Sequence, residues 1–278
     1  MKYRRGGHAN TGFTLIEMIT TIVILGILSG VVATFFKPAV DSYVDVANRA
    51  ELSEKADTAI RQLSRELQTA LPNSVRSTTT GSTDCIEFLP VVAGGRYRVQ
   101  PNSTGGGDIL DFAIQDSAFD VLASEGLSAI VGSGQSFHVA IFNLGTPGAN
   151  AYNGDVTATI DTARTTVSPA QAIRLNAGKQ FPFFSPRNRF FVIPDHSVIY
   201  HCRNNGIYRS TPVIAATAPA TCQHTNTETL VVDHVTACSF TYTPAVDQRN
   251  GLISISLQLS QNNETLSLYQ EVLVSNVP

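Results

Sequence analysis

The residues best suited to take part in chemistry lie close to the N-terminus, in the run Gly12-Phe13-Thr14-Leu15-Ile16-Glu17. Glu17 is the only acidic residue among residues 1–37, and it stands at the edge of a long apolar stretch. An unpartnered carboxylate in a membrane helix costs roughly 2.5–3.5 kcal/mol at mid-bilayer, and less near the edge. Phe13 lies four residues earlier, one turn away on the same helical face. Cleavage before Phe13 would create an α-amine there, so the spacing indicates an amine–carboxylate pair.

A second group of reactive residues comprises His201-Cys202 and Cys222-Gln223-His224. Two thiolates and two imidazoles are a ligand set that Zn²⁺ accepts, but the spacing is not that of a known zinc finger. Cysteines of exported proteins tend to pair rather than remain thiolates. We therefore expect disulfides, and neither a metal nor a cofactor.

The disulfide pairing is left open by the sequence, because the four cysteines Cys85, Cys202, Cys222 and Cys238 allow three connectivities. The pairing Cys202–Cys222 is the most local one and encloses 19 residues. Closing a loop of that size stabilises a fold by roughly 3 kcal/mol in the chain-entropy model. On this ground we expect Cys202–Cys222, which leaves Cys85–Cys238 to span the rest of the chain.

Motifs that indicate an enzyme are absent from the sequence. There is no GxSxG, no HExxH and no phosphate loop, and residues 132–137 (GSGQSF) lack the third glycine of a dinucleotide fingerprint. The carboxylates of Asp108, Asp111, Asp116 and Asp120 are conceivable calcium ligands, but no DxDxDG loop is present and a solvated acidic surface is the simpler interpretation. We expect no catalytic residue and no enzymatic activity.

The composition favours an exported, membrane-associated chain over a nucleic-acid-binding protein. The 278 residues are 43% hydrophobic and 15% charged, with a formal net charge of −3. Lys2, Arg4 and Arg5 make the N-terminal tip basic, whereas residues 38–278 carry a net charge of −6. This asymmetry is typical of a chain oriented across a membrane.

The element that must position Glu17 is the apolar run of residues 18–36, which holds 19 uncharged residues. As a helix it is roughly 28 Å long, close to the thickness of a bilayer core. The basic tip places residue 1 in the cytoplasm and residue 37 outside. A secretory signal peptide has a shorter apolar region and a small-residue cleavage site, which residues 35–38 (FFKP) do not provide. A simple signal anchor explains the length and orientation but not Glu17.

From Gly12 to Glu17 the sequence resembles the class III signal of type IV prepilins and type II secretion pseudopilins. That signal is a short basic leader ending in Gly, then Phe-Thr-Leu-Ile-Glu, then an apolar helix. The resemblance implies that a prepilin peptidase cleaves between Gly12 and Phe13 and N-methylates Phe13, and that Glu17 serves in assembly. It further implies a leader of residues 1–12, an N-terminal helix of residues 13–71 and a globular domain of residues 72–278.

The same resemblance implies a location and a set of partners. Residues 13–36 would cross the inner membrane once or line a filament core, with a cytoplasmic N-terminus and a periplasmic or pilus-exposed body. The implied partners are other major and minor pilins, the prepilin peptidase and an inner-membrane assembly platform, and no nucleic acid.

After Pro38 the sequence predicts that the helix continues, with a kink or a local melt at the proline. Apolar residues then recur at spacings of three and four as one stripe, which should pack on the globular domain. The members of the stripe are Leu52, Ala56, Ile60, Leu63, Leu67 and Leu71. Residues 72–74 (PNS) should end the helix. Together with the strands described next, this predicts an α+β fold, the lollipop plan of pilins.

Beyond residue 75, short apolar runs punctuated by Gly, Pro, Asn and Ser predict a mainly antiparallel β-sheet body. The expected strands are Cys85–Pro90, Ile109–Ile114, Phe137–Asn143, Arg189–Ile193, Val198–Arg203, Ile207–Ser210, Leu230–Asp233, Ser239–Thr243, Leu252–Ser260 and Leu266–Val274. Turns are expected at Asn205-Gly206 and at residues 261–264 (QNNE). A helix is conceivable over Ser117–Leu122, and exposed loops are expected at residues 101–107 and 144–154.

The chain from residue 187 onward is similar to large minor pilins and J-type pseudopilins, and within that group to proteins of mannose-sensitive haemagglutinin (MSHA) pilus biogenesis. The similarity lies in residues 189–193, 197–202 and 205–209, in Val235, Phe240 and Tyr242, and in the cysteines. It favours a minor pilin that takes part in pilus assembly. A type II secretion pseudopilin and a pilus-displayed adhesin that binds through loops 101–107 and 144–154 remain alternatives; a membrane-anchored enzyme is disfavoured.

Overall fold

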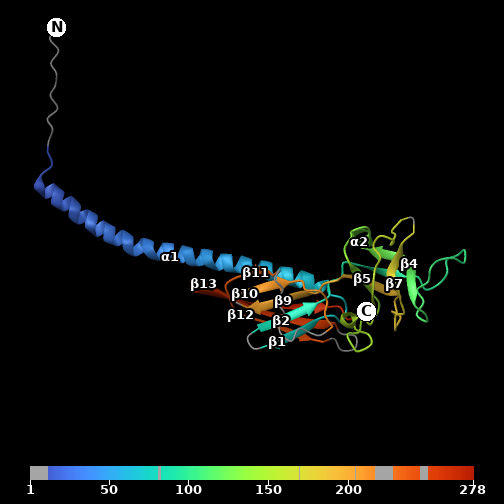
Figure 1. Cartoon of the computed structure of the whole chain (residues 1–278). Helices are drawn as coiled ribbons and strands as arrows, with labels where there is room; N and C mark the ends of the chain where they lie inside the picture. The colour runs from blue at the N-terminus through green and yellow to red at the C-terminus, as the bar shows by residue number, and fades with distance from the viewer. Residues whose placement is uncertain (1–11, 81–82, 169, 204, 217–227, 245–249) are drawn as a thin grey trace, which may run out of the picture. The chain divides into compact units, whose positions relative to one another are not determined.

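The computed structural model describes residues 12–80, 83–168, 170–203, 205–216, 228–244 and 250–278. It begins with one long helix, α1 (Leu15–Gln68), which contains Pro38 (Figure 1). The helix continues through Pro38 without a break, so the local melt that the sequence allowed does not occur. The chain divides into two compact units, residues 1–51 and residues 52–278.

The second half of α1 belongs to the larger unit and buries one face. Leu52, Ala56, Ile60, Leu63 and Leu67 are all buried, as the spacing of the apolar stripe predicts. They lie in one hydrophobic core with residues of two antiparallel sheets. The stripe prediction is therefore confirmed, and Leu71, the last member of the stripe, is buried just beyond the end of the helix.

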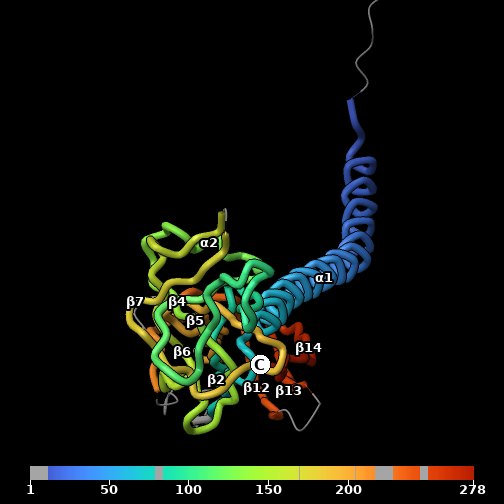
Figure 2. The backbone as a smooth tube through the Cα atoms, turned by 90° about the vertical axis from the view of Figure 1, so that its right-hand side faces the viewer, coloured from blue at the N-terminus to red at the C-terminus, as the bar shows by residue number. Residues whose placement is uncertain are grey.

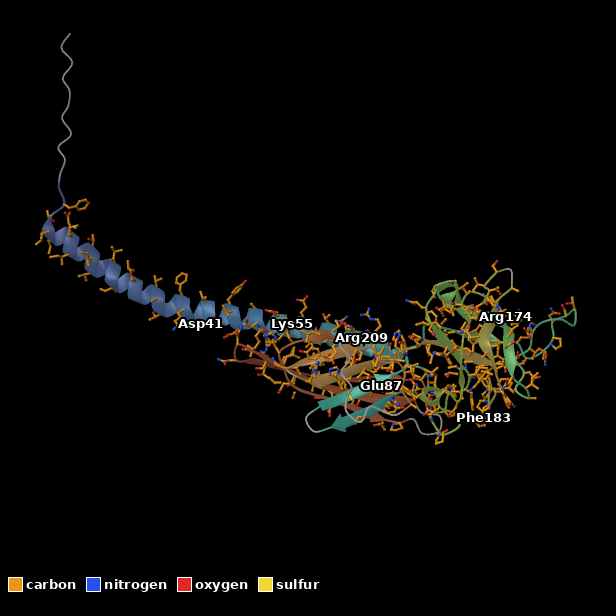
Figure 3. All side chains as sticks on the ribbon, viewed as in Figure 1. Asp41, Lys55, Glu87, Arg174, Phe183 and Arg209 are labelled. Carbon is orange, nitrogen blue, oxygen red and sulfur yellow. A yellow bond between two sulfur atoms is a disulfide. The ribbon has the colours of Figure 1, made fainter. Side chains whose placement is uncertain are left out.

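The first sheet has five strands in the order β1-β2-β9-β10-β11, all antiparallel. Its strands are β1 (Arg76–Thr80), β2 (Thr83–Phe88), β9 (Val198–Arg203), β10 (Gly206–Ser210) and β11 (Thr229–Val232). The expected hairpin between β9 and β10 is confirmed, but its turn ends at Asn205, which has a positive φ of 63°, because Gly206 already pairs with Arg203 as the first residue of β10. Arg209 of β10 reaches α1, where its Nε lies 2.9 Å from Oε2 of Glu66 (Figure 3).

The second sheet is a three-stranded meander of β12 (Val235–Thr243), β13 (Gly251–Gln261) and β14 (Glu264–Val274). Strand β13 has one buried and one more exposed face, because apolar and polar residues alternate along it. Its fully buried residues are Ile253, Ile255, Leu257 and Leu259, and the residues between them are not fully buried. Gln261 pairs with Glu264 across Asn262 and Asn263, which both have positive φ, as a two-residue hairpin turn requires. The hairpin predicted from the sequence is confirmed.

A disulfide between Cys202 of β9 and Cys238 of β12 joins the two sheets, with the Cα atoms 6.1 Å apart. The expected pairs Cys202–Cys222 and Cys85–Cys238 are therefore wrong. Cys85 is disulfide-bonded as well, and Cys222 lies outside the described residues. Sequence separation hardly favours one pair over the other, because lengthening the loop from a separation of 20 to one of 36 changes the free energy of loop closure by only about 0.5 kcal/mol. The packing of the two sheets decides which sulfur atoms meet.

A third sheet has six strands in the order β6-β5-β8-β3-β4-β7, of which the sequence predicted β5 and β8, at residues 137–143 and 189–193, but not the other four. Its elements are β3 (Ala93–Tyr97), β4 (Asp116–Glu125), α2 (Leu127–Ile130), β5 (Phe137–Ala140), the 3₁₀ helix η1 (Ala151–Asn153), β6 (Thr157–Thr159), β7 (Ala172–Lys179) and β8 (Arg189–Pro194). Asp161 N donates to Arg174 O at 2.8 Å and Ile160 forms a bridge with Leu175, so the edge strands β6 and β7 meet. The sheet thus closes into a small barrel, whose labelled strands lie together in Figure 2.

The barrel has its own hydrophobic core, which includes Tyr97, Phe119, Phe181 and Phe190. In the chain it is an insertion: residues 89–197 leave the first sheet after β2 and return to it at β9. The larger unit, residues 52–278, therefore holds two cores and a third, smaller cluster around Tyr152.

Two expected elements of the barrel are wrong. Residues 109–114 form no strand, and Ser117–Leu122, where a helix was conceivable, lies within strand β4. In β4 the register shifts between Ala118 and Asp116, so the alternation that identifies a strand is interrupted. The bulge explains why the alternation of β4 did not identify it as a strand.

Candidate cleavage and assembly site

The bond predicted to be cleaved lies in an accessible, non-helical segment. Gly12 and Phe13 precede the first helical residue, Leu15, and Phe13 is 83% exposed. A Cβ atom built on Gly12 would meet no described atom within 4 Å. The fold of the described chain therefore places no demand for glycine at position 12, and the reason for glycine must be sought in a partner that binds this segment.

Glu17 lies in the first turn of α1 and is tied to the residue that begins the helix. Its Oε2 accepts hydrogen bonds from the backbone N of Thr14 at 2.9 Å and from Thr14 Oγ1 at 3.0 Å, and Glu17 N donates to Thr14 Oγ1 at 3.4 Å. These reciprocal contacts form a capping box, which satisfies backbone donors that a helix start leaves open. The carboxylate also stands where the helix dipole favours negative charge.

Thr14 is a functional residue that the sequence reasoning overlooked. The signature of a capping box is Ser or Thr followed three residues later by Glu or Gln, which Thr14 and Glu17 satisfy. The sequence therefore contains the signal for a structural role of Glu17 in its own chain. The carboxylate of Glu17 is thus oriented by a contact within its own chain.

The rest of the N-terminal unit presents apolar side chains without covering them. In α1 an 18-residue window has a mean hydropathy of 2.3, and none of it is buried. Among the described residues, α1 is the one helix long and apolar enough to cross a membrane. Gly26 and Gly30 interrupt the side chains of this surface, and a Cβ atom on either would meet nothing within 4 Å in the described chain. This segment fits a single-pass membrane anchor.

The residues considered as zinc ligands do not come together as a site in the described part of the chain. Cys202 is in a disulfide, which removes its thiolate, and residues 222–224 lie outside the described residues. His201 is fully buried within the first sheet, stacked on Tyr208 at 5.8 Å between ring centroids, and its Nε2 accepts a hydrogen bond from Arg203 at 3.2 Å.

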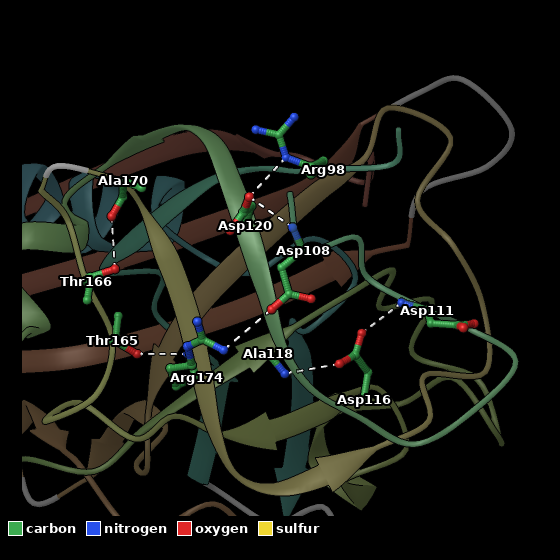
Figure 4. A network of polar contacts seen from close by, with 10 residues as sticks. All are labelled: Arg98, Asp108, Asp111, Asp116, Ala118, Asp120, Thr165, Thr166, Ala170 and Arg174. Carbon is green, nitrogen blue, oxygen red and sulfur yellow. Dashed lines mark hydrogen bonds and ion pairs between the residues drawn. The ribbon is translucent and has the colours of Figure 1, made fainter. Parts of the chain in front are cut away.

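The aspartates considered as calcium ligands do lie close together, but their oxygens hold the chain's own groups (Figure 4). Asp116 accepts from Asp111 N at 2.9 Å and from Ala118 N at 3.1 Å. Asp120 Oδ2 accepts from Asp108 N at 3.1 Å. Within the described residues, no group of three acidic, His or Cys side chains is arranged to hold a metal ion.

Two arginines complete this aspartate network. Nε of Arg98 lies 3.1 Å from Asp120 Oδ2, and Nη1 of Arg174 lies 3.5 Å from Asp108 Oδ2. Burial, and then the charges of Asp116 and Asp120, raise the pKa of Asp108 above its ordinary value. The network fastens the loop before β4 to strands β4 and β7, which is a structural task.

The two loops expected at the surface differ from each other. Residues 101–107 are exposed, and Asn102 Oδ1 accepts from Thr104 N and Gly106 N within the loop. In residues 144–154, by contrast, Ala149 and Tyr152 are buried, and Tyr152 Oη donates to Ser74 O at 3.0 Å. The second loop therefore joins the barrel to the helix-bearing core.

Comparison with known proteins bears on the N-terminal segment. Residues 7–33 match the family model of the prokaryotic N-terminal methylation motif. No curated protein and no solved structure matches the chain. The matched segment includes Gly12, Phe13 and Glu17, and it supports a type IV pilin-like protein with a structural role in pilus or secretion assembly. Such a protein is processed by a prepilin peptidase and assembles with other pilins.

Proposed function

We propose that the chain is a minor pilin-like structural subunit that takes part in assembly of a type IV pilus of the MSHA type. Among the proteins of MSHA pilus biogenesis, it most resembles MshO. The observation that carries the proposal is the exposed Gly12–Phe13 bond directly before a capped, uncovered apolar helix, within the segment that matches the methylation motif. The MSHA assignment rests on the similarity of the sequence from residue 187 onward.

Processing is the first step of the proposed function. The peptidase cleaves after Gly12 and methylates the new amine of Phe13, which removes the basic leader and changes the formal charge from −3 to −6. The absence of a side chain at Gly12 lets an extended segment enter the peptidase at the cytoplasmic face. The body is then periplasmic, on the outer side of the inner membrane, and is carried into the pilus through the assembly platform.

Assembly is the second step. In a bundle of apolar helices the carboxylate of Glu17 pairs with the methylated amine of Phe13 in a neighbouring subunit. An ion pair in an apolar surrounding loses much of its strength to desolvation, so its main effect is on the axial register between helices. Retention of Glu17 suits a subunit that lies beneath another one, rather than at the outermost tip of the filament.

The test compares two variants at equal expression. Gly12→Glu should accumulate as the uncleaved chain in the inner membrane, whereas Glu17→Ala should be cleaved normally but crosslink more weakly to other pilins. N-terminal mass analysis and crosslinking are the measurements. Cleavage near Pro38 would sink the proposal, and unchanged crosslinking of Glu17→Ala would restrict that residue to its capping role.

The nearest alternative is a subunit of a type II secretion pseudopilus of the J type, since the same residues and the same peptidase serve both machines. Piliation of a deletion strain distinguishes them: loss of pili supports the pilus assignment, and loss of protein secretion with normal pili supports the pseudopilin.

A further inference from the structure

The outer face of the barrel carries an open groove of about 700 Å³, a volume in the range of small-molecule sites. It runs over strands β3, β4 and β8, and its lining includes none of the aspartates of the network. The residues that matter for the argument are Gly94, Arg96, Glu125, Arg189 and Phe191.

The sheet register places these residues in two adjacent rows. Arg96 pairs with Arg189 on β8, and two residues earlier Gly94 pairs with Phe191 on one side and Glu125 on the other. Residues two apart on a strand point to the same face. Because the middle of the second row is a glycine, the floor there is bare backbone: a Cβ atom on Gly94 would lie 3.3 Å from Phe190 O and 3.6 Å from Phe191 Cδ1.

The first row is a pair of arginines without a counter-charge. Like charges directly opposite on neighbouring strands destabilise a sheet. In the described part of the chain neither Arg96 nor Arg189 forms an ion pair, and the buried Nε of Arg189 has no hydrogen-bond partner. Burial, and then the charges of Arg187 and Arg96, lower the pKa of Arg189. These guanidinium groups offer hydrogen-bond donors suited to a carboxylate.

The residues of the second row limit which kind of anion can bind in the groove. Glu125 is exposed on the far side of Gly94, and its carboxylate would repel a polyanion such as a nucleic acid or a strongly acidic peptide. The same carboxylate accepts hydrogen bonds from hydroxyl groups. Phe191 contributes a half-buried ring to the groove, against which an apolar ring face can pack.

We propose that this groove binds a carboxylated sugar residue, with the sugar carboxylate on Arg96 and Arg189, the ring over Gly94 beside Phe191, and hydroxyl groups on Glu125. The proposal goes beyond a role in assembly and does not depend on it, since it concerns only the barrel. It locates recognition on a sheet face, not on the loops at 101–107 or 144–154.

The test uses the full chain in detergent micelles with glucuronic acid as the probe, and saturation-transfer NMR as the readout. We expect glucuronic acid to bind and glucose to bind at least tenfold more weakly. Arg96→Gln, on an exposed side chain, should weaken glucuronic acid binding about tenfold. Arg164→Gln makes the same charge change at an exposed barrel site and should leave binding unchanged.

A second variant changes the shape of the groove without changing its charge. Gly94→Val keeps both arginines and a strand-compatible backbone but fills the floor, so it should abolish binding while the thermal unfolding of the barrel stays cooperative. Three results would overturn the proposal: equal binding of glucose and glucuronic acid, undiminished binding by Arg96→Gln or Gly94→Val, or binding of a polyglutamate peptide in preference to the sugar.

Discussion

The two halves of helix α1 have the same secondary structure but opposite surroundings. In the first half, residues 18–36 carry no charge, and all of their side chains are exposed in the chain itself. Residues 52–68 bury one stripe and leave the other faces polar, with Asp57 and Arg61 paired at 2.8 Å. The contrast teaches that the second half finds its partner within the chain, whereas the first half is built for a partner outside it.

The largest expected effects come from placing an aspartate in each half of the helix. Leu63→Asp puts a charge into the core, and we expect it to lower the free energy of unfolding of the body by about 5 kcal/mol or more while the chain stays in the membrane fraction. Leu28→Asp should leave the body folded but make insertion of the helix into the membrane about 2.5–3.5 kcal/mol less favourable, so that less of the chain is in the membrane fraction.

Carbonate extraction measures the membrane fraction, and near-ultraviolet circular dichroism with limited proteolysis measures the folding of the body. If both variants lost membrane integration, or if both unfolded the body, the two halves of α1 would not be independent in the way their burial indicates.

The next largest effect concerns the link between the two sheets that the second half of α1 covers. Removing Cys238 by Cys238→Ser should lower the free energy of unfolding by about 3–4 kcal/mol, as the entropy model gives for a loop of this length. Peptide mapping without reduction should yield Cys202 joined to Cys238. Because Cys222 is the one cysteine then left, we expect it to be the partner of Cys85; a peptide joining Cys202 to Cys222 would refute both pairs.

The smallest effect lies in the barrel and depends on pH. Burial lowers the pKa of His138, against a weaker opposite influence of Asp195. The unfolded chain therefore binds a proton at a higher pH than the folded chain does, and stability should fall as the pH drops below about 6.5. His138→Gln should remove part of this slope in unfolding titrations from pH 7.5 to 5. An unchanged slope in this variant would exclude His138 as its source.

The parts of the fold that could be predicted are those in which one buried face of a helix or strand determines the local sequence pattern. The stripe from Leu52 to Leu67 and the alternation from Ile253 to Leu259 each report a single buried face, and both predictions are confirmed. The disulfide was mispredicted because sequence distance is a weak guide once sheets pack. In the barrel, β5 and β8 were predicted and the other strands were missed. β6 has only three residues, β4 contains a bulge, and Gly94 and Gly95 weaken the apolar pattern of β3.

The candidate cleavage and assembly site could be predicted from the sequence for a different reason. Gly12, Phe13 and Glu17 lie within one contiguous motif, so no tertiary contact is needed to bring them together. The groove on the barrel, by contrast, collects Arg96 and Arg189 from strands 93 residues apart in the sequence, and only the register of β3 with β8 makes them neighbours.

The point at which the barrel enters the chain has a consequence for how such a protein can change. Phe88 and Val198 are register partners on adjacent antiparallel strands, so the chain leaves and re-enters the first sheet at nearly the same place. A tight turn suffices to join two strands so arranged. Everything between these residues can in principle be exchanged, lengthened or deleted while each remaining strand keeps its neighbours. The helix and its two sheets thus form a scaffold with one insertion site. The inserted domain can be replaced during evolution without a change in the helix that serves assembly.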